Sequence, residues 1–280
     1  MKLIRYYDDD VIKPGIIDSN GHLRDLSKEV KDISGEVLSE AGIENLKKIN
    51  VDNLPAISDN VRYAPCVGGT QKVICVGLNY RGHVDELKMK TPEEPVIFLK
   101  APSSICGAYD NLVLPPGSTH TDWETELLIV IGSKTKQIKE TEAEAHIAGY
   151  SVVNDVSERH SQLERGGQWT KGKSYDTFAS IGPYLVTKDE VPDPENLEVS
   201  TKVNGEIKQQ SNTSSMVFSL NYIVSYISFF MTLLPGDVIC TGTPEGVAHG
   251  TSNNYLEEDD IVESAVESLG QQKRKVVLQI

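Results

Sequence analysis

Two carboxylates separated by a single residue, Glu124 and Glu126, lie in a stretch that is typical of a β-strand, residues 120–132. The second half of this stretch is an apolar run rich in Ile and Val. Because side chains alternate between the two faces of a strand, both carboxylates point the same way, with Cα atoms roughly 7 Å apart. They repel each other unless positive charge lies between them, and a hard divalent cation prefers such oxygen ligands. The alternative is an ordinary solvated strand face.

A third carboxylate, Asp155, follows a buried strand predicted over residues 147–153. Ligands tend to lie at the carboxyl ends of strands. Ser157 is a favourable N-cap for a following helix, on which Arg159 and Gln162 would share one face. An arginine and an amide together suit a substrate carboxylate, and the alternative is a surface ion pair.

His83 and Glu86 follow the strand predicted over residues 72–76 and lie three residues apart. If this segment is helical, their side chains are neighbours on one face. A carboxylate beside an imidazole orients the ring and raises its basicity, which a general base requires. The alternative is a surface histidine with an incidental acidic neighbour.

The letters of a phosphate-binding loop occur once, as Gly167 followed after four residues by Gly172, Lys173 and Ser174. Such a loop should follow a hydrophobic strand, whereas a polar helix is expected here over residues 158–165. The context therefore argues against nucleotide binding.

The composition excludes several classes of partner. The 280-residue chain carries 41 Asp and Glu against 27 Lys and Arg, a net charge of −14. Nucleic acids and anionic membranes require a basic surface, so neither is expected as a partner. The four cysteines lack metal-binding spacing and are expected to be small buried side chains. The N-terminus is too polar for a signal peptide, and a cytoplasmic protein is expected.

Residues 216–234 contain no charge and approach the length of a membrane-spanning helix. However, Asn221, Ser225, Ser228 and Thr232 recur at helical spacing and form one polar stripe. We predict a largely buried helix that does not span a membrane, with a subunit contact as one setting for it.

The chain divides into two predicted domains, in an α+β fold that is mostly β. Residues 1–69 mix short strands, turns and short helices, and the Pro and Gly residues near position 69 are typical of a boundary. Residues 70–280 alternate strands with few helices. We predict a small N-terminal α/β domain over 1–69 and a larger domain over 70–280.

Five motifs occur in order along the chain: Val76-Gly77-Leu78-Asn79-Tyr80 with His83 and Glu86, Asp122-Trp123-Glu124-Thr125-Glu126-Leu127, Asn154-Asp155-Val156-Ser157, residues 171–178, and residues 235–244. In this order they resemble the fumarylacetoacetate hydrolase family over nearly the whole chain. The opening residues are similar to the bacterial branch of ureidoglycolate lyase-like proteins and 2,4-diketo-3-deoxy-sugar-acid hydrolases.

The resemblance implies a mixed β-roll catalytic domain over 70–280, a homodimer and a bound Mg²⁺ or Mn²⁺. It implies that the ion is held by Glu124, Glu126 and Asp155. These carboxylates form an oxygen-only partial shell, with room for waters and a chelating 2-oxo acid.

The resemblance also implies catalytic and substrate-binding roles. Lys173 would lie at the substrate enolate, and His83 with Glu86 would activate water on a mobile lid. The residues implied in substrate binding are Arg159, Gln162, Thr177 near the metal shell, and Thr243 at the substrate carboxylate.

These roles imply hydrolysis of a C–C bond in a 2,4-dioxo acid, of acylpyruvate or diketo-deoxy-sugar-acid type, to pyruvate and a carboxylic acid. The cation and Lys173 would stabilise the enolate, while His83 delivers water to the more distant carbonyl. The same site would serve oxaloacetate decarboxylation or isomerisation of a 2-oxo-diene-dioate. A non-catalytic protein that binds a keto acid or a metal is a further alternative, but a binder has no need of a base.

Overall fold

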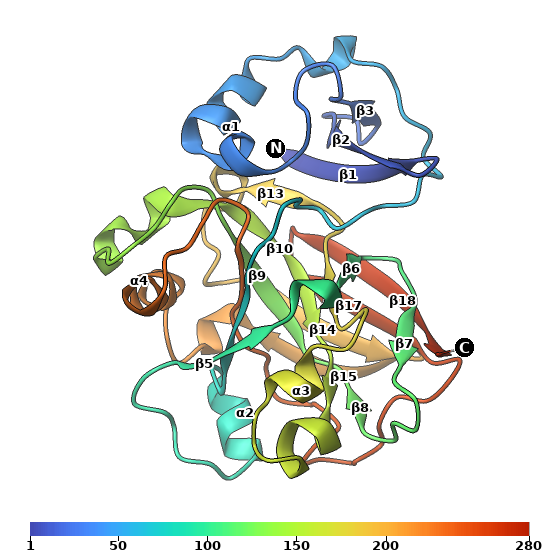
Figure 1. Ribbon diagram of the computed structural model, residues 1–280, viewed down its shortest axis with the longest axis vertical. Coiled ribbons are helices and arrows are strands. Elements are labelled where there is room, and N and C mark those ends of the chain that lie inside the picture. Colours follow the sequence, from blue (N-terminus) through green and yellow to red (C-terminus); the bar gives the residue numbers. More distant parts are fainter. Residues whose placement is uncertain (280) are drawn as a thin grey trace.

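The main sheet of the computed structural model, which describes residues 1–279, has eleven strands (Figure 1). Its order is β3-β2-β1-β13-β10-β9-β16-β4-β5, with β12 paired to β10 and β6 paired to β12. The bounds of these strands are β1 (Lys2–Asp8), β2 (Val11–Ile17), β3 (Leu23–Asp25), β4 (Val73–Gly77), β5 (Val96–Lys100), β6 (Ile105–Gly107), β9 (Thr125–Ile131), β10 (Ile147–Asp155), β12 (Ala179–Ile181), β13 (Leu185–Thr187) and β16 (Val238–Cys240).

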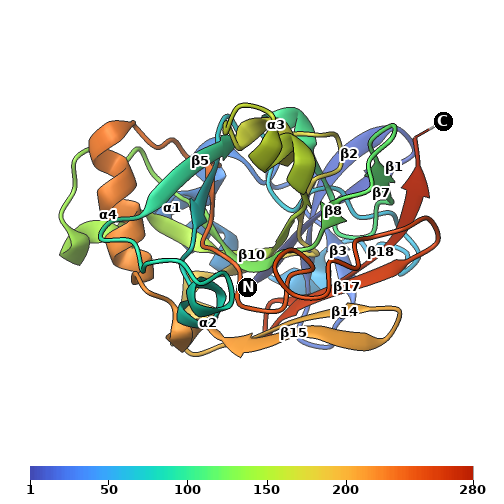
Figure 2. The ribbon, with the colours of Figure 1, turned by 90° about the horizontal axis from the view of Figure 1, so that it is seen from below.

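A second sheet has five strands in the order β15-β14-β17-β18-β7, and β11 pairs with β8 alone. Their bounds are β7 (Leu112–Leu114), β8 (Thr121–Asp122), β11 (Ser157–Glu158), β14 (Glu198–Val203), β15 (Glu206–Asn212), β17 (Ile261–Val266) and β18 (Gly270–Leu278). Pairing is mostly antiparallel, with parallel pairs such as β16 with β4. The strands curve around the centre of the molecule (Figure 2), which confirms the predicted mixed, mostly β fold.

β9 and β10 form the middle of the main sheet, and every residue in both strands is buried. Their apolar runs are therefore continuous, as expected of strands covered on both faces. Alternate β9 side chains enter two different core clusters: Ile129 and Ile131 pack on one side, and Leu128 and Val130 on the other. The acidic residues at the start of β9 are thus carried by a rigid, buried frame.

The N-terminal residues continue the main sheet. β1 pairs with β13, with Lys2 opposite Val186 and Leu3 opposite Leu185. The core cluster around Leu3 and Leu38 also contains Val130 of β9, so the first residues share their core with the rest of the chain. The helix α1 (Glu40–Lys47) covers this end of the molecule. The domain division between residues 69 and 70 stays a prediction.

The other helices are short. α2 (Arg81–Glu86) and α3 (Thr170–Lys173) lie at the end of the molecule opposite the N-terminal strands (Figure 1). Residues 160–164 form a π-helical turn after β11, where a longer helix beginning near Ser157 was predicted. The helix predicted over 216–234 is reduced to α4 (Leu220–Phe230), because Ser219 Oγ accepts from the Tyr222 N–H and sets its start.

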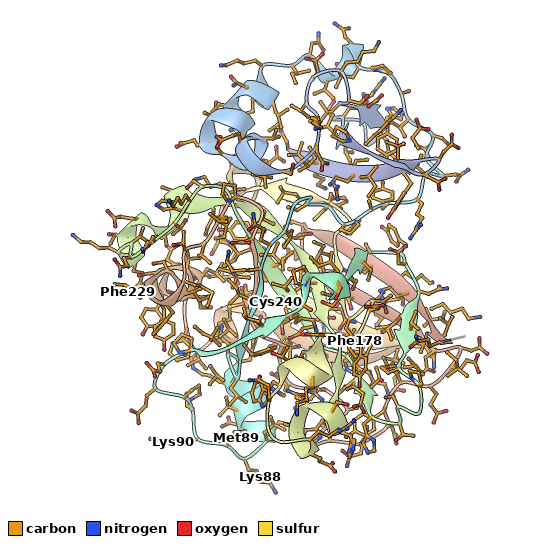
Figure 3. All side chains as sticks on the ribbon, viewed as in Figure 1. Lys88, Met89, Lys90, Phe178, Phe229 and Cys240 are labelled. Carbon is orange, nitrogen blue, oxygen red and sulfur yellow. The ribbon has the colours of Figure 1, made fainter. Side chains whose placement is uncertain are left out.

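Two members of the predicted polar stripe, Ser225 and Ser228, are buried on the inner face of α4. Ser225 Oγ donates to the Ile138 carbonyl oxygen, and Ser228 Oγ accepts from the Ile138 N–H. These two bonds attach the helix to Ile138 of its own chain, and a subunit contact at α4 stays a prediction. Phe229 and Phe230 lie on the exposed side (Figure 3 labels Phe229). Within residues 1–279, every helix is too short or too polar to cross a bilayer.

Candidate active site

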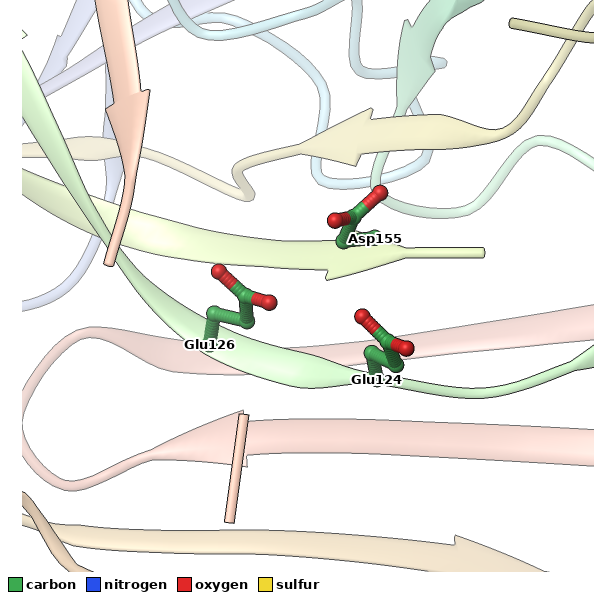
Figure 4. A group of neighbouring side chains, drawn as sticks. All are labelled: Glu124, Glu126 and Asp155. Atoms are coloured by element: carbon green, nitrogen blue, oxygen red, sulfur yellow. The ribbon is translucent and has the colours of Figure 1, made fainter. Parts of the chain in front are cut away.

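Three buried carboxylates meet where β9 begins and β10 ends (Figure 4). One ligand atom from each of Glu124, Glu126 and Asp155 lies within 4.8 Å of the others. The strand predicted over 120–132 is interrupted between β8 and β9, but Glu124 and Glu126 stay on the same side. Asp155 lies on the adjacent strand, and its N–H donates to the Glu124 carbonyl oxygen at 2.8 Å.

Three cationic side chains neutralise two of these carboxylates. Lys173 Nζ lies 2.7 Å from Glu124 Oε2 and 2.9 Å from Asp155 Oδ2. Lys100 Nζ pairs with the other oxygen of Asp155, and Arg159 Nη1 lies 2.7 Å from Glu124 Oε1. All three cations are buried. Glu124 and Asp155 therefore each contact positive charge through both of their oxygens.

Glu126 differs from its two neighbours. Among residues 1–279 it forms no ion pair, and its carboxylate accepts one hydrogen bond, from the Gly242 N–H at 2.7 Å. Burial and the Asp155 carboxylate raise the pKa of Glu126 well above its usual value. A divalent cation would supply the positive charge that Glu126 lacks, and the all-oxygen donor set suits Mg²⁺ or Mn²⁺. The residues present therefore fit the implied ion.

The pKa of Glu124 shifts in the opposite direction from that of Glu126. Burial raises its pKa, but the Lys173 ammonium and the Arg159 guanidinium outweigh burial and lower the value to about 2. Burial alone would lower the pKa of Lys173, whereas Asp155 and Glu124 raise it above its usual value. Lys173 therefore carries its proton throughout the neutral pH range.

The His83–Glu86 pair lies on α2 and is held from two sides. His83 Nδ1 lies 3.2 Å from Glu86 Oε2, and the Gly246 N–H donates to Glu86 Oε1 at 2.9 Å. Because Nδ1 faces a carboxylate, Nε2 is left as the basic nitrogen of the ring. His83 lines the same cavity as Glu124 and Glu126, so the structure brings the pair to the carboxylate cluster.

Arg159 and Gln162 also line this cavity and contact each other, with Nη1 donating to Oε1 at 3.1 Å. Arg159 is extensively paired: its Nε and Nη2 lie 2.9 Å and 2.8 Å from Asp122 Oδ2. The Arg159 guanidinium is therefore occupied by the carboxylates of Asp122 and Glu124. The amide nitrogen of Gln162 is better placed than Arg159 to bind a ligand.

Thr243 lines the cavity, but its hydroxyl group is already engaged. Thr243 Oγ1 donates to the Thr125 carbonyl oxygen at 3.0 Å and accepts from Gln209 Nε2 at 2.9 Å. The hydroxyl hydrogen can reach a substrate carboxylate only if the bond to Thr125 breaks. The substrate-binding role of Thr243 stays a prediction.

The structure does not bring Thr177 into the cavity. Its hydroxyl group accepts from the Val113 N–H at 2.9 Å, and its carbonyl oxygen accepts from buried Arg274 at 2.8 Å. Thr177 has a positive φ of 67° and joins the end of α3 to β12. This turn directs its side chain towards β7, away from the carboxylates.

The sequence reasoning missed four residues around the site. They are the buried cation Lys100, the buried anion Asp122, and the cavity-lining side chains Trp169 and His249. The sequence did contain a signal for Lys100, because this residue ends an apolar strand. A lysine there points to a buried acidic partner, since a lysine is almost never fully buried unless it is paired. The cavity itself has a volume of about 320 Å³.

Comparison with known proteins gives consistent matches. The family model described as fumarylacetoacetate (FAA) hydrolase, C-terminal, matches residues 72–277. A protein of Burkholderia orbicola (strain MC0-3), which carries the name hydrolase without a stated substrate, is 50% identical over 277 residues, covering 98% of each chain.

Several solved structures resemble the whole chain, and two of them illustrate the likeness. Fumarylacetoacetate hydrolase from psychrophilic Exiguobacterium antarcticum has a TM-score of 0.88 at 35% identity, with 100% of both chains covered. Maleylpyruvate hydrolase from Sphingobium sp. SYK-6, in complex with manganese(II) and pyruvate, has a TM-score of 0.83 at 26% identity, again with 100% of both chains covered.

Proposed function

Because this chain belongs to the fumarylacetoacetate hydrolase family, we propose that it is a divalent-metal-dependent hydrolase of 2,4-dioxo acids. The products would be pyruvate and a carboxylic acid. The observation that carries the proposal is the cavity that His83, paired with Glu86, shares with Glu124 and Glu126 of the carboxylate cluster. A protein that only binds a keto acid has no need of an oriented base, so the pair favours catalysis.

Glu124, Glu126 and Asp155 would hold Mg²⁺ or Mn²⁺, and manganese is the ion in the maleylpyruvate hydrolase structure. The bound ion would supply Lewis-acid stabilisation of negative charge on the 2-oxo oxygen. Lys173 remains protonated beside Glu124 and Asp155, so it offers a second fixed positive charge to the enolate of pyruvate.

His83 would act as the general base through Nε2, while Glu86 accepts the Nδ1–H and holds the ring. His83 takes one proton from water, and the water oxygen adds to the C4 carbonyl carbon. The C3–C4 bond then breaks and leaves its electron pair on C3, as the enolate of pyruvate. The proton held by His83 passes to C3, so one water is consumed for each pyruvate and carboxylic acid released.

The direct test is pyruvate release from a panel of 2,4-dioxo acids, followed with lactate dehydrogenase and NADH. We expect turnover with Mg²⁺ or Mn²⁺, loss of turnover after exhaustive chelation with EDTA, and recovery when the ion is restored. Full turnover after chelation would contradict the metal requirement. Absence of pyruvate from every member of the panel, with either ion present, would contradict the proposed reaction.

Replacing Gly246 with alanine is expected to lower kcat by roughly 10- to 100-fold, because the general base loses its orientation. Gly246 has a φ of +97°, and a Cβ there would collide with the Lys208 carbonyl oxygen. The loop must shift, and the N–H that binds Glu86 shifts with it. Steady-state kinetics and the NMR titration of His83 would measure the effect.

The matched control is Gly117→Ala. Gly117 also has a positive φ, of 73°, but a Cβ there meets nothing within 4 Å. Both substitutions strain the backbone, and the alanine at 246 alone disturbs Glu86. Equal losses of activity in the two variants would show that the Gly246 contact does not orient the base.

The homodimer and the cytoplasmic location stay predictions. The exposed Phe229 and Phe230 of α4, at 59% and 65% exposure, form the apolar surface on which we expect a second copy to pack.

A further inference from the structure

The cavity has a polar side and an apolar side. The polar side is the carboxylate cluster with Lys173, Arg159 and Gln162. The apolar side, here called the apolar wall, consists of Leu78, Leu87, Met89, Phe98, Leu163 and Trp169. A 2,4-dioxo acid carries its carboxylate and both carbonyl oxygens at one end of the molecule. If that end occupies the polar side, the group attached to C4 must face the apolar wall.

The apolar wall begins directly beside the catalytic lysine. Lys173 Nζ lies over the Phe98 ring, 5.0 Å from its centroid, and Phe98 packs edge-to-face on Trp169 at 5.2 Å. Trp169 in turn lies on Gly77, where an added Cβ would come within 2.7 Å of the indole ring. Thr170, the residue after Trp169, is also held in place, because its Oγ1 donates to the Leu99 carbonyl oxygen. The wall is therefore preformed and rigid at its inner end.

The outer end of the wall exposes apolar surface to water. Met89 and Leu163 are 50% and 40% exposed, and Figure 3 shows Met89 in the loop after α2 at the lower edge of the molecule. They line the cavity from two different segments, residues 87–89 and 160–164. An apolar ligand group that covers Met89 and Leu163 would remove this surface from water, which is favourable in proportion to the area covered.

The charges that line the cavity offer no free partner to a second anion. Arg159 and Lys173 are each paired with two carboxylates. Burial and the nearby Arg159 guanidinium lower the pKa of His249, so this ring is neutral near pH 7. Lys88 extends from the lower edge of the molecule into solvent (Figure 3) and does not line the cavity.

We infer that the apolar wall is the acyl subsite of the proposed hydrolase and selects 2,4-dioxo acids with an alkyl or aryl group on C4. Substrates whose acyl group ends in a carboxylate, as in the maleylpyruvate named for one structural relative, are disfavoured because the second charge would lose water against apolar side chains without gaining a partner. Polyhydroxylated sugar acids are disfavoured because side-chain hydrogen-bond partners are scarce along the wall. This inference rests on the proposed function.

The first test compares kcat/KM along a series of acylpyruvates with lengthening alkyl chains. Each methylene that becomes buried should raise kcat/KM about fourfold until the wall is filled. A substrate of the same length that ends in a carboxylate should be worse by roughly 100-fold or more. A flat series, or a preference for the carboxylate or the polyhydroxylated chain, would overturn the inference.

The second test changes the wall without touching the carboxylate cluster. Leu163→Arg places a cation at the outer end of the wall, and Leu99→Arg is the matched control, because Leu99 is equally 40% exposed but does not line the cavity. Leu163→Arg should reduce the preference for the alkyl substrate by roughly 10-fold or more. Leu99→Arg should leave it unchanged. An equal change of substrate preference in the two variants would contradict the assignment of the wall as the acyl subsite.

A binding measurement separates this inference from the proposed reaction. 2-Oxoheptanoate and 2-oxoheptanedioate have the same chain length and lack the C4 carbonyl that is hydrolysed. Calorimetry with the Mn²⁺-loaded protein should show tighter binding of 2-oxoheptanoate. If no dioxo acid is cleaved but this preference is found, the proposed hydrolysis fails and the apolar selectivity stands. If dioxo acids are cleaved and the dioate binds better, the inference fails alone.

Discussion

Replacing Glu126 with alanine is expected to abolish Mn²⁺ binding and, with it, pyruvate release from 2,4-dioxo acids. Glu126 is buried and has no cation partner among residues 1–279, so the ion would be its main source of compensating charge. The loss of affinity should exceed the roughly 10- to 100-fold that follows from removing an outer-shell hydrogen-bond partner of a metal ligand. Isothermal titration with Mn²⁺ measures it without reference to activity.

Thermal unfolding gives a second measure of the same site. The three carboxylates come together only in the folded chain, so the ion binds the native state and stabilises it. At a free Mn²⁺ concentration 100 times its Kd, the free energy of unfolding of the wild-type protein should rise by about 2.7 kcal/mol. Glu126→Ala should show little of this gain.

Two further variants distinguish loss of the metal site from misfolding of the protein. Glu126→Gln removes the charge but keeps an oxygen that can accept from the Gly242 N–H. Glu158→Gln is the matched control, since Glu158 is also buried but lies outside the cluster, where it accepts from the Ser161 N–H at 2.7 Å. Undiminished Mn²⁺ binding in both Glu126 variants would show that the carboxylates do not hold the ion.

Replacing His83 with alanine should lower the hydrolysis of 2,4-dioxo acids by roughly 10²- to 10⁴-fold, the usual worth of a general base. Mn²⁺ affinity should stay unchanged, because Glu86 and not the ion is the partner of His83 Nδ1. Decarboxylation of oxaloacetate requires no attacking water, so this reaction should suffer much less. Parallel assays of pyruvate from both substrates, with titration of Mn²⁺, separate these effects.

The control for His83 is the surface pair of His160 and Glu164. His160 Nδ1 lies 3.1 Å from Glu164 Oε2, much as in the His83–Glu86 pair, but both side chains are exposed and lie outside the cavity. His160→Ala should leave both reactions intact. Equal loss of hydrolysis and decarboxylation in His83→Ala would assign the pair to closing the site rather than activating water. Loss of Mn²⁺ binding in that variant would make His83 a ligand.

Local periodicity was enough to predict much of the candidate site. Glu124 and Glu126 share a face because extended side chains alternate, even where the strand is interrupted between β8 and β9. His83 and Glu86 touch because residues three apart on a helix are neighbours. The same local rule relates Arg159 to Gln162, although the turn that carries them is π-helical and not a regular α-helix.

The sequence determined the family, the mostly β fold and the segments on which the acidic residues and the base lie. The tertiary structure decided which distant groups meet: Lys100 is paired with Asp155, 55 residues away, and Thr177 turns towards β7. It also assembled the apolar wall from separate segments and turned Ser225 and Ser228 of α4 inward. The physical reason is that local periodicity fixes only the face on which a side chain lies. Strand register and core packing then decide which residues lie against that face. They therefore also decide which buried charges acquire a partner of opposite sign.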